Sequence, residues 1–163
     1  MIFSVASKGQ LPIVKDLAFK IWPIAYGEIL SKKQLEYMLE LIYNIESLEK
    51  QQENGQVFLL AEENGIYFGF ASYEINCNTT DKTKIHKLYV LPKTQRKGIG
   101  KQLVEYIKKS AIENGNSALF LNVNRFNQAL QFYKKNGFAI IETVDIEIGN
   151  GYLMEDYVME LKL

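Results

Sequence analysis

Apolar residues in the first third of the chain recur every three or four positions, a spacing typical of helices buried on one side. This pattern predicts a helix from Gln10 to about Tyr26, preceded by a short strand at Ile2–Ala6. Pro12 suits the first turn of that helix. Pro23 is expected to kink or end the helix, because proline has no backbone N–H to donate.

Two further helices are expected before the spacing changes. Ser31 can cap the second helix, and Gln34 stands where the partner of a capping box is found. Residues Ile45–Glu53 predict a short third helix. The spacing then becomes that of a strand at Val57–Ala61, and Glu63-Asn64-Gly65 predicts a hairpin turn because Asn-Gly tolerates positive φ.

The second half of the chain predicts strands that alternate with two helices. The expected strands are Ile66–Asn76, Thr83–Val90, Ala118–Val123, Phe138–Ile148 and Tyr152–Leu161. The expected helices are Ile99–Asn114, ending near Gly115, and Asn127–Asn136, ending at Gly137. This order predicts an α/β (α+β) domain with a largely antiparallel first half and a βαβ crossover near the middle.

Composition narrows the class of protein. The 163 residues suit one domain, 1–163, and 47% of them are apolar, enough for a core. The formal net charge is zero, so no basic surplus points to nucleic acid. No apolar run is long enough for a membrane span and no signal peptide is evident, so we expect a cytoplasmic protein. With one cysteine, Cys77, and one histidine, His86, neither an internal disulfide nor a zinc site is expected.

The segment from Leu88 to Gly100 predicts an anion site. It runs from a strand through a loop into a helix, and its glycines let the backbone N–H groups and the helix N-terminus approach a phosphate. Basic residues surround the turn: Lys93, Arg96, Lys97 and Lys101. The Walker and dinucleotide-binding patterns do not match, and a plain turn with a basic rim remains the alternative.

Gln95-x-x-Gly98-x-Gly100 resembles the Gln/Arg-x-x-Gly-x-Gly/Ala motif of the GNAT acetyltransferases. The resemblance implies the GNAT fold, a mixed and mostly antiparallel central sheet flanked by helices with a βαβ cofactor-binding centre, and acetyl-CoA as cosubstrate. It implies that backbone groups of Leu88 and Val90 bind the pantetheine arm and that the loop lines the pyrophosphate. The implied cofactor-binding residues of this segment are Leu88, Tyr89, Val90, Gln95, Arg96, Lys97, Gly98, Ile99, Gly100 and Lys101.

Residues 122–138 resemble the second cofactor motif of that family, a strand, an asparagine, and a short helix with Phe-Tyr before Gly-Phe. Asn127 is also a helix cap on physical grounds, although it stands one residue closer to Ala129 than the family pattern has it. By resemblance, Asn127 and Ala129 contact the cofactor and Tyr133 is the general acid. A phenol, with a pKa near 10, is protonated at neutral pH and can donate to a departing thiolate. The alternative is that Tyr133 is an ordinary core aromatic.

The acceptor amine must lose a proton before it attacks. His86, two residues before Leu88 and expected on the same face of the strand, is the candidate base, with Glu74 as a weaker candidate. The alternative is that His86 is an ordinary polar side chain at a strand end. Substrate contacts are expected from Trp22, Tyr26, Glu28, Glu74 and Tyr152, although Trp22 and Tyr26 can equally be core.

The tail from Ile148 to Leu161 resembles a bacterial branch that includes polyamine acetyltransferases, which implies a small amine acceptor such as spermidine or a diamine. A protein N-terminus, a lysine or an amino sugar are alternative acceptors on the same machinery. A CoA-binding sensor without turnover is the alternative from another class, and a homodimer is suggested by analogy with the family. No metal is expected.

Overall fold

The structure is a computed structural model that describes the backbone of residues 1–163 and every side chain except those of Gln95 and Arg96. Its strands are β1 (Ile2–Val5), β2 (Val57–Glu63), β3 (Ile66–Glu74), β4 (Lys82–Val90), β5 (Ala118–Asn124), β6 (Ala139–Gly149) and β7 (Tyr152–Lys162). Its α-helices are α1 (Leu11–Tyr26), α2 (Lys32–Tyr43), α3 (Ile45–Glu53), α4 (Ile99–Glu113) and α5 (Ala129–Lys135). Short 3-10 turns are η1 (Lys8–Gln10), η2 (Cys77–Thr79) and η3 (Pro92–Lys97).

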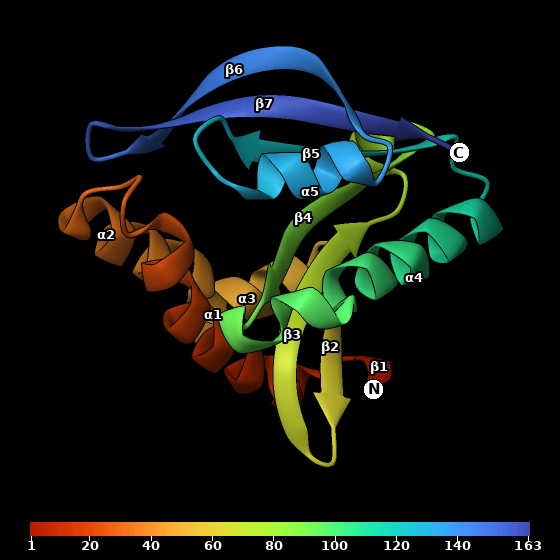
Figure 1. Cartoon of the computed structure of the whole chain (residues 1–163), viewed down its shortest axis with the longest axis horizontal. Helices are drawn as coiled ribbons and strands as arrows, with labels where there is room; N and C mark the ends of the chain where they lie inside the picture. The colour runs from red at the N-terminus through yellow and green to blue at the C-terminus, as the bar shows by residue number, and fades with distance from the viewer.

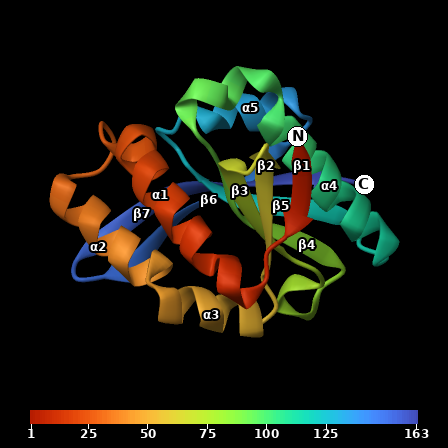
Figure 2. The same cartoon turned by 90° about the horizontal axis from the view of Figure 1, so that it is seen from below.

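The strands form one sheet in the order β1-β2-β3-β4-β5-β7-β6. Only β4 and β5 run parallel, joined by the crossover helix α4, and the other neighbours are antiparallel. Figure 1 shows α4 and α5 on one side of this sheet, and Figure 2 shows α1, α2 and α3 on the other. The predicted mixed α/β domain with a βαβ centre is therefore confirmed.

Each face of the sheet has its own apolar core. The face covered by α1–α3 buries side chains such as Phe58, Leu60 and Phe70, while the face covered by α4 buries their neighbours Leu59 and Ala71. Such alternation follows from the two-residue period of a strand. A residue can therefore be assigned to a face by the cluster with which it packs.

Pro23 does not end the first helix, which continues to Tyr26. Proline removes one backbone hydrogen bond from a helix interior, but the last turns bring Trp22 and Tyr26 into the core, where 3% and 5% of their surfaces remain exposed. Burial of two large aromatic side chains offsets the lost bond, because each is worth about 1.5–3 kcal/mol. The hairpin expected at Asn64-Gly65 does form, and both residues have positive φ, 54° and 78°.

Candidate functional site

The turn between β4 and α4 has the geometry of an anion site. Gly98 is the N-cap of α4 with φ +74°, a left-handed conformation that favours glycine. Gly100 lies in the first turn against α5, where an added Cβ would stand 3.2 Å from Cζ of Phe132. The N-terminal amides of α4 therefore remain open to a phosphate at the positive end of the helix dipole. This arrangement fits the CoA pyrophosphate.

The other residues expected around the pyrophosphate differ in exposure. Lys97 and Lys101 are exposed at the turn, while Ile99 is 1% exposed and packs into the core below it. Lys97 and Lys101 can therefore add positive charge at the phosphate, and Ile99 anchors the helix start. The side chains of Gln95 and Arg96, also expected here, lie outside the described part of the chain.

Strands β4 and β5 pair only along their first halves. Residues Lys82–Ile85 pair with Ala118–Leu121, whereas β4 continues beside β3 as far as Val90. Figure 1 shows β4 curving away from β5 over the rest of its length. Leu88, on the α4 face, and Tyr89, on the α1–α3 face, follow within this diverging part. An extended ligand arm can add to a strand in such a place, which is where the pantetheine arm is expected.

Of four aromatic side chains expected at the site, Trp22, Tyr26 and Tyr89 pack together in the core of the α1–α3 face. The hydroxyls of Tyr26 and Tyr89 are 2.9 Å apart, and the ring of Trp22 lies 4.6 Å from that of Tyr26. Burial is the largest effect on the pKa of Tyr26 and raises it. Hydrogen bonds with the Tyr89 and Asn127 side chains lower this pKa, and the charge of Asp156 raises it. The fold therefore brings α1, β4 and α5 together at one buried centre.

Tyr133, on α5, is the fourth of these side chains. It is 7% exposed, and its ring packs edge-on against Phe132 and Phe138. Burial, and then the nearby Tyr26, raise its pKa above the usual value of a phenol. The Tyr133 hydroxyl is therefore protonated at neutral pH, as a proton donor must be.

Asn127 positions the start of α5 in a slightly different way from the one expected. Gln128 is the N-cap, and Oδ1 of Asn127 accepts a hydrogen bond of 2.9 Å from the N–H of Ala129. The Asn127 side chain thus bonds the first turn of α5 from the position before the N-cap. This agrees with the sequence, in which only Gln128 separates Asn127 from Ala129. Its amide remains close to the Tyr26 hydroxyl.

α2 meets the β6–β7 hairpin next to Tyr152, a residue expected to contact the acceptor. Oη of Tyr37 donates to the Ile148 carbonyl at 3.1 Å, and Nε2 of Gln34 donates to the Leu153 carbonyl at 3.0 Å. The rings of Tyr37 and Tyr152 lie 5.4 Å apart. An open groove of about 680 Å³ is lined by Lys33, Glu36, Tyr37, Glu40, Leu41, Asn44, Asn150 and Tyr152.

Of the other side chains expected to contact the acceptor, Tyr152 lines this groove and Glu28 is exposed just after α1. Trp22 and Tyr26 instead belong to the core of the α1–α3 face. They can shape the reaction centre from within, but they do not line the groove.

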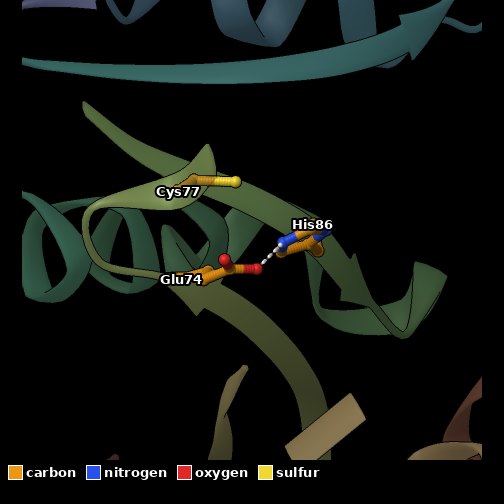
Figure 3. Close-up of side chains that lie close together, drawn as sticks. All are labelled: Glu74, Cys77 and His86. Atoms are coloured by element: carbon orange, nitrogen blue, oxygen red, sulfur yellow. Dashed lines mark hydrogen bonds and ion pairs between the residues drawn. The ribbon is translucent and has the colours of Figure 1, made fainter. Parts of the chain in front are cut away.

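His86 lies on the opposite face of β4 from Leu88, which corrects the expectation that they share a face. In the β3–β4 register, Ser72 faces Lys87 and Tyr73 faces Ile85, so His86 is the extra residue of a β-bulge. Its Nε2 lies 3.0 Å from Oε1 of Glu74 (Figure 3).

Glu74 belongs to the α1–α3 face. It follows Tyr73, whose hydroxyl bonds Ser110 of α4 on the other face, and a Cβ added to Gly55 after α3 would stand 3.7 Å from its Cγ. Burial, and then the charge of Lys84, lower the pKa of His86 to about 4. The imidazole is therefore neutral at neutral pH and a weak proton acceptor.

Two charged residues are buried, which the sequence interpretation did not predict. Asp156, on β7, is 6% exposed, and its Oδ1 has no hydrogen-bond partner among the described side chains. Burial raises the pKa of its carboxyl, while Asn122, Arg125 and Lys84 lower it. The only signal in the sequence is an acidic residue at an inward position of an alternating strand.

Lys87 is the second of them, 7% exposed on the α1–α3 face. Its Nζ donates to Oε1 of Gln51 at 2.6 Å and to Oε1 of Gln56 at 3.1 Å. Burial, and then Lys84, lower its pKa to about 7. Nothing in the sequence indicates this burial, because it depends on how α3 packs over β4.

Comparison with known proteins agrees with this geometry. The family model described as "Acetyltransferase (GNAT) domain" matches residues 28–161. A spermidine N(1)-acetyltransferase of Thermoplasma acidophilum is 29% identical over 152 residues, 90% of each chain. The N-acetyltransferase YuaI of Bacillus subtilis is 27% identical over 154 residues, 91% of this chain and 87% of the relative.

Solved structures share the fold. The PaiA N-acetyltransferase of Thermoplasma acidophilum in complex with coenzyme A superposes with a TM-score of 0.81 and 27% identity over 100% of both chains. The expected fold class is thereby confirmed. Among the described residues, no helix combines the length and the apolar character needed to cross a bilayer.

Proposed function

The chain belongs to the GNAT family of acetyl-CoA-dependent N-acetyltransferases, and we propose that its acceptor is a small primary amine of the polyamine or diamine class. The observation that carries this proposal is the groove between α2 and the β6–β7 hairpin, which joins the carboxylates of Glu36 and Glu40 to the rings of Tyr37 and Tyr152. Carboxylates and aromatic faces attract ammonium groups. Similarity to a spermidine N(1)-acetyltransferase supports the same substrate class.

Tyr133 is proposed as the general acid. The amine nitrogen attacks the thioester carbonyl carbon, the carbon–sulfur bond breaks, and the sulfur leaves with the electron pair. The buried Tyr133 hydroxyl keeps its proton at neutral pH and gives it to the sulfur, whose thiol has a pKa near 8.5 like that of cysteine. General acid catalysis of this kind contributes about 100-fold or more to the rate.

Asp156 is proposed to accept the proton of the amine, directly or through water. One of its carboxylate oxygens lacks a partner among the described side chains and can take a new hydrogen bond. The charge of Asp156 raises the pKa of Tyr26, which supports a role for the carboxylate near the buried tyrosines. Burial raises the pKa of Asp156, and a higher pKa makes a carboxylate a better proton acceptor.

His86 stays a prediction as the base, and its geometry favours it less. Its Nε2 is hydrogen-bonded to Glu74, and its pKa near 4 makes the imidazole a poor acceptor. Accepting a proton there would also charge a largely buried ring beside Lys84 and Lys87, whose charges already lower its pKa.

The test is release of CoA thiol from acetyl-CoA with a panel of amines: spermidine, putrescine, a lysine peptide, a peptide with a free N-terminus and an aminoglycoside. Tyr133→Phe and Asp156→Asn are each expected to lower kcat on spermidine by about 100-fold. Tyr106→Phe, a tyrosine of α4 in the same apolar cluster, is the control and should retain activity.

Preference for a peptide or an aminoglycoside over spermidine would refute the proposed acceptor class. Full activity of Tyr133→Phe would remove Tyr133 as the acid and leave the enzyme class intact. Binding of acetyl-CoA without thiol release to any amine would instead support a CoA sensor.

A further inference from the structure

Three side chains with metal-binding atoms converge next to the bulge of β4. They are Glu74 at the end of β3, Cys77 in η2 and His86 at the bulge (Figure 3). One carboxylate oxygen, the thiol sulfur and one imidazole nitrogen all lie within 4.8 Å of one another. The contact between Glu74 and His86 is shorter, at 3.0 Å.

The fold holds these side chains in place from three directions. His86 follows Ile85, which packs on the α4 face, so strand alternation turns His86 to the opposite face, that of Glu74. Cys77 is 3% exposed and follows Asn76, which the buried amide of Asn116 holds by two hydrogen bonds of 3.1 and 2.6 Å. The sheet and the loop that follows α4 therefore fix the positions of the donor atoms.

The donor set is one that zinc prefers. Thiolate, imidazole and carboxylate are the usual zinc ligands, at about 2.0–2.3 Å from the ion. In a tetrahedron such bonds place the donor atoms roughly 3.3–3.8 Å apart. The donor atoms now lie up to 4.8 Å apart, so the widest separation must shorten by about one ångström. Rotation of the Glu74 and His86 side chains, which are 26% and 20% exposed, can provide this change.

We propose that Glu74, Cys77 and His86 bind one zinc ion, with water as the fourth ligand. The sequence, with one thiol and one imidazole, predicted no zinc site. The third ligand is a carboxylate, and only the fold brings it close to the other two. On binding, the Cys77 thiol releases its proton to solvent and the thiolate takes the ion.

The lysines around the site do not oppose this assignment. Lys84 and Lys87 both act electrostatically on His86, and they would repel a bare dication. A thiolate and a carboxylate bring two negative charges, so the ligated ion is neutral overall and the ammonium groups are not repelled. Lys84 also favours the thiolate form of Cys77, whose pKa it lowers against the larger effect of burial.

The ion would join the end of β3, the turn η2 and the bulge of β4. Because a metal that binds only the folded chain stabilises it, zinc should raise the melting temperature of the protein. It would also fix the bulge beyond which β4 curves away from β5.

The experiment measures metal binding to the reduced, metal-free full-length protein without acetyl-CoA or amine, so it is independent of the proposed function. Cobalt(II) serves as the spectroscopic probe, and zinc affinity follows from competition with a chromophoric chelator. We expect one equivalent of cobalt with a thiolate-to-cobalt charge-transfer band, displaced by zinc, and a higher melting temperature with zinc.

Cys77→Ser should abolish the charge-transfer band, and Glu74→Gln should weaken zinc binding by about 100-fold or more, since even outer-sphere partners cost about 10–100-fold. Asp81→Asn is the control, an exposed neighbouring carboxylate whose backbone, not its side chain, bonds Ser117. Circular dichroism establishes that each variant is folded. Absence of the band in the wild type, or equal zinc affinity in wild type and Glu74→Gln, would overturn the proposal.

Discussion

Lys87 offers the most direct test of the packing of α3 over the sheet. Its ammonium is enclosed by Gln51 and Gln56 and lies 5.5 Å from the ring centroid of Phe58 and 5.9 Å from that of Tyr43. Lys87→Met keeps the length of the side chain and removes its charge and its donors. The substitution leaves Oε1 of Gln51 without the Lys87 donor, a cost that does not depend on pH.

The magnitude follows from the pKa of Lys87, lowered from 10.5 to about 7 in the folded chain. Between these values the unfolded chain holds a proton that the folded chain has released, so the free energy of unfolding rises with pH. Below about pH 7 both states hold the proton, and the full penalty of burying the charge is present. Integration from pH 7 to pH 9 gives a gain of about 2 kcal/mol in wild type that Lys87→Met lacks.

The assay is urea unfolding at pH 7, 8 and 9, with the free energy of unfolding obtained by linear extrapolation. The difference between wild type and Lys87→Met cancels the titration of all other groups. It should shift in favour of wild type by about 2 kcal/mol over this range. Lys109→Met, which removes an exposed lysine of α4, should show no such shift. Parallel curves for wild type and Lys87→Met would refute the argument that the fold buries a charged amine here.

Two further predictions concern the site itself. His86→Gln, which can still bond Glu74 but cannot accept a proton, should lower kcat by less than about threefold, and a loss of about 100-fold in the thiol-release assay would instead restore His86 as the base. Gly98→Ala and Gly115→Ala replace glycines that both have φ +74° and space for a Cβ, so each should cost about 1–2 kcal/mol in urea unfolding. Only Gly98→Ala should also raise KM for acetyl-CoA, and an equal rise for Gly115→Ala would show that the effect is one of stability alone.

Much of the fold could be predicted because its signals are local. Asn64-Gly65 determines a hairpin by the backbone conformations that these two residues tolerate. Ser31 caps α2 by accepting the N–H of Gln34 at 3.1 Å, as predicted, although the Gln34 side chain donates to the Leu153 carbonyl and closes no capping box. Gly98 likewise marks the start of α4, since the left-handed N-cap needs a residue without a Cβ.

The parts that could not be predicted depend on pairing between distant segments. The bulge in the β3–β4 register puts His86 and Leu88 on opposite faces, and a bulge results from unequal pairing of two strands rather than from the sequence of one. Pro23 was expected to kink or end α1, but the helix continues past it and buries Tyr26 in the core.

The bulge also explains why residues of one strand have such different tasks. Ile85, before the bulge, and Leu88, after it, both pack on the α4 face. In a regular strand, residues three positions apart would point to opposite faces. The extra residue therefore leaves two adjacent side chains, His86 and Lys87, on the α1–α3 side, the first beside Glu74 and the second beneath α3. Pairing with β5 ends at Ile85, next to the bulge. The irregularity at His86 and Lys87 is thus also the point at which β4 turns away from β5, so a metal bound by His86 would stabilise the part of the strand beside which the cofactor is expected.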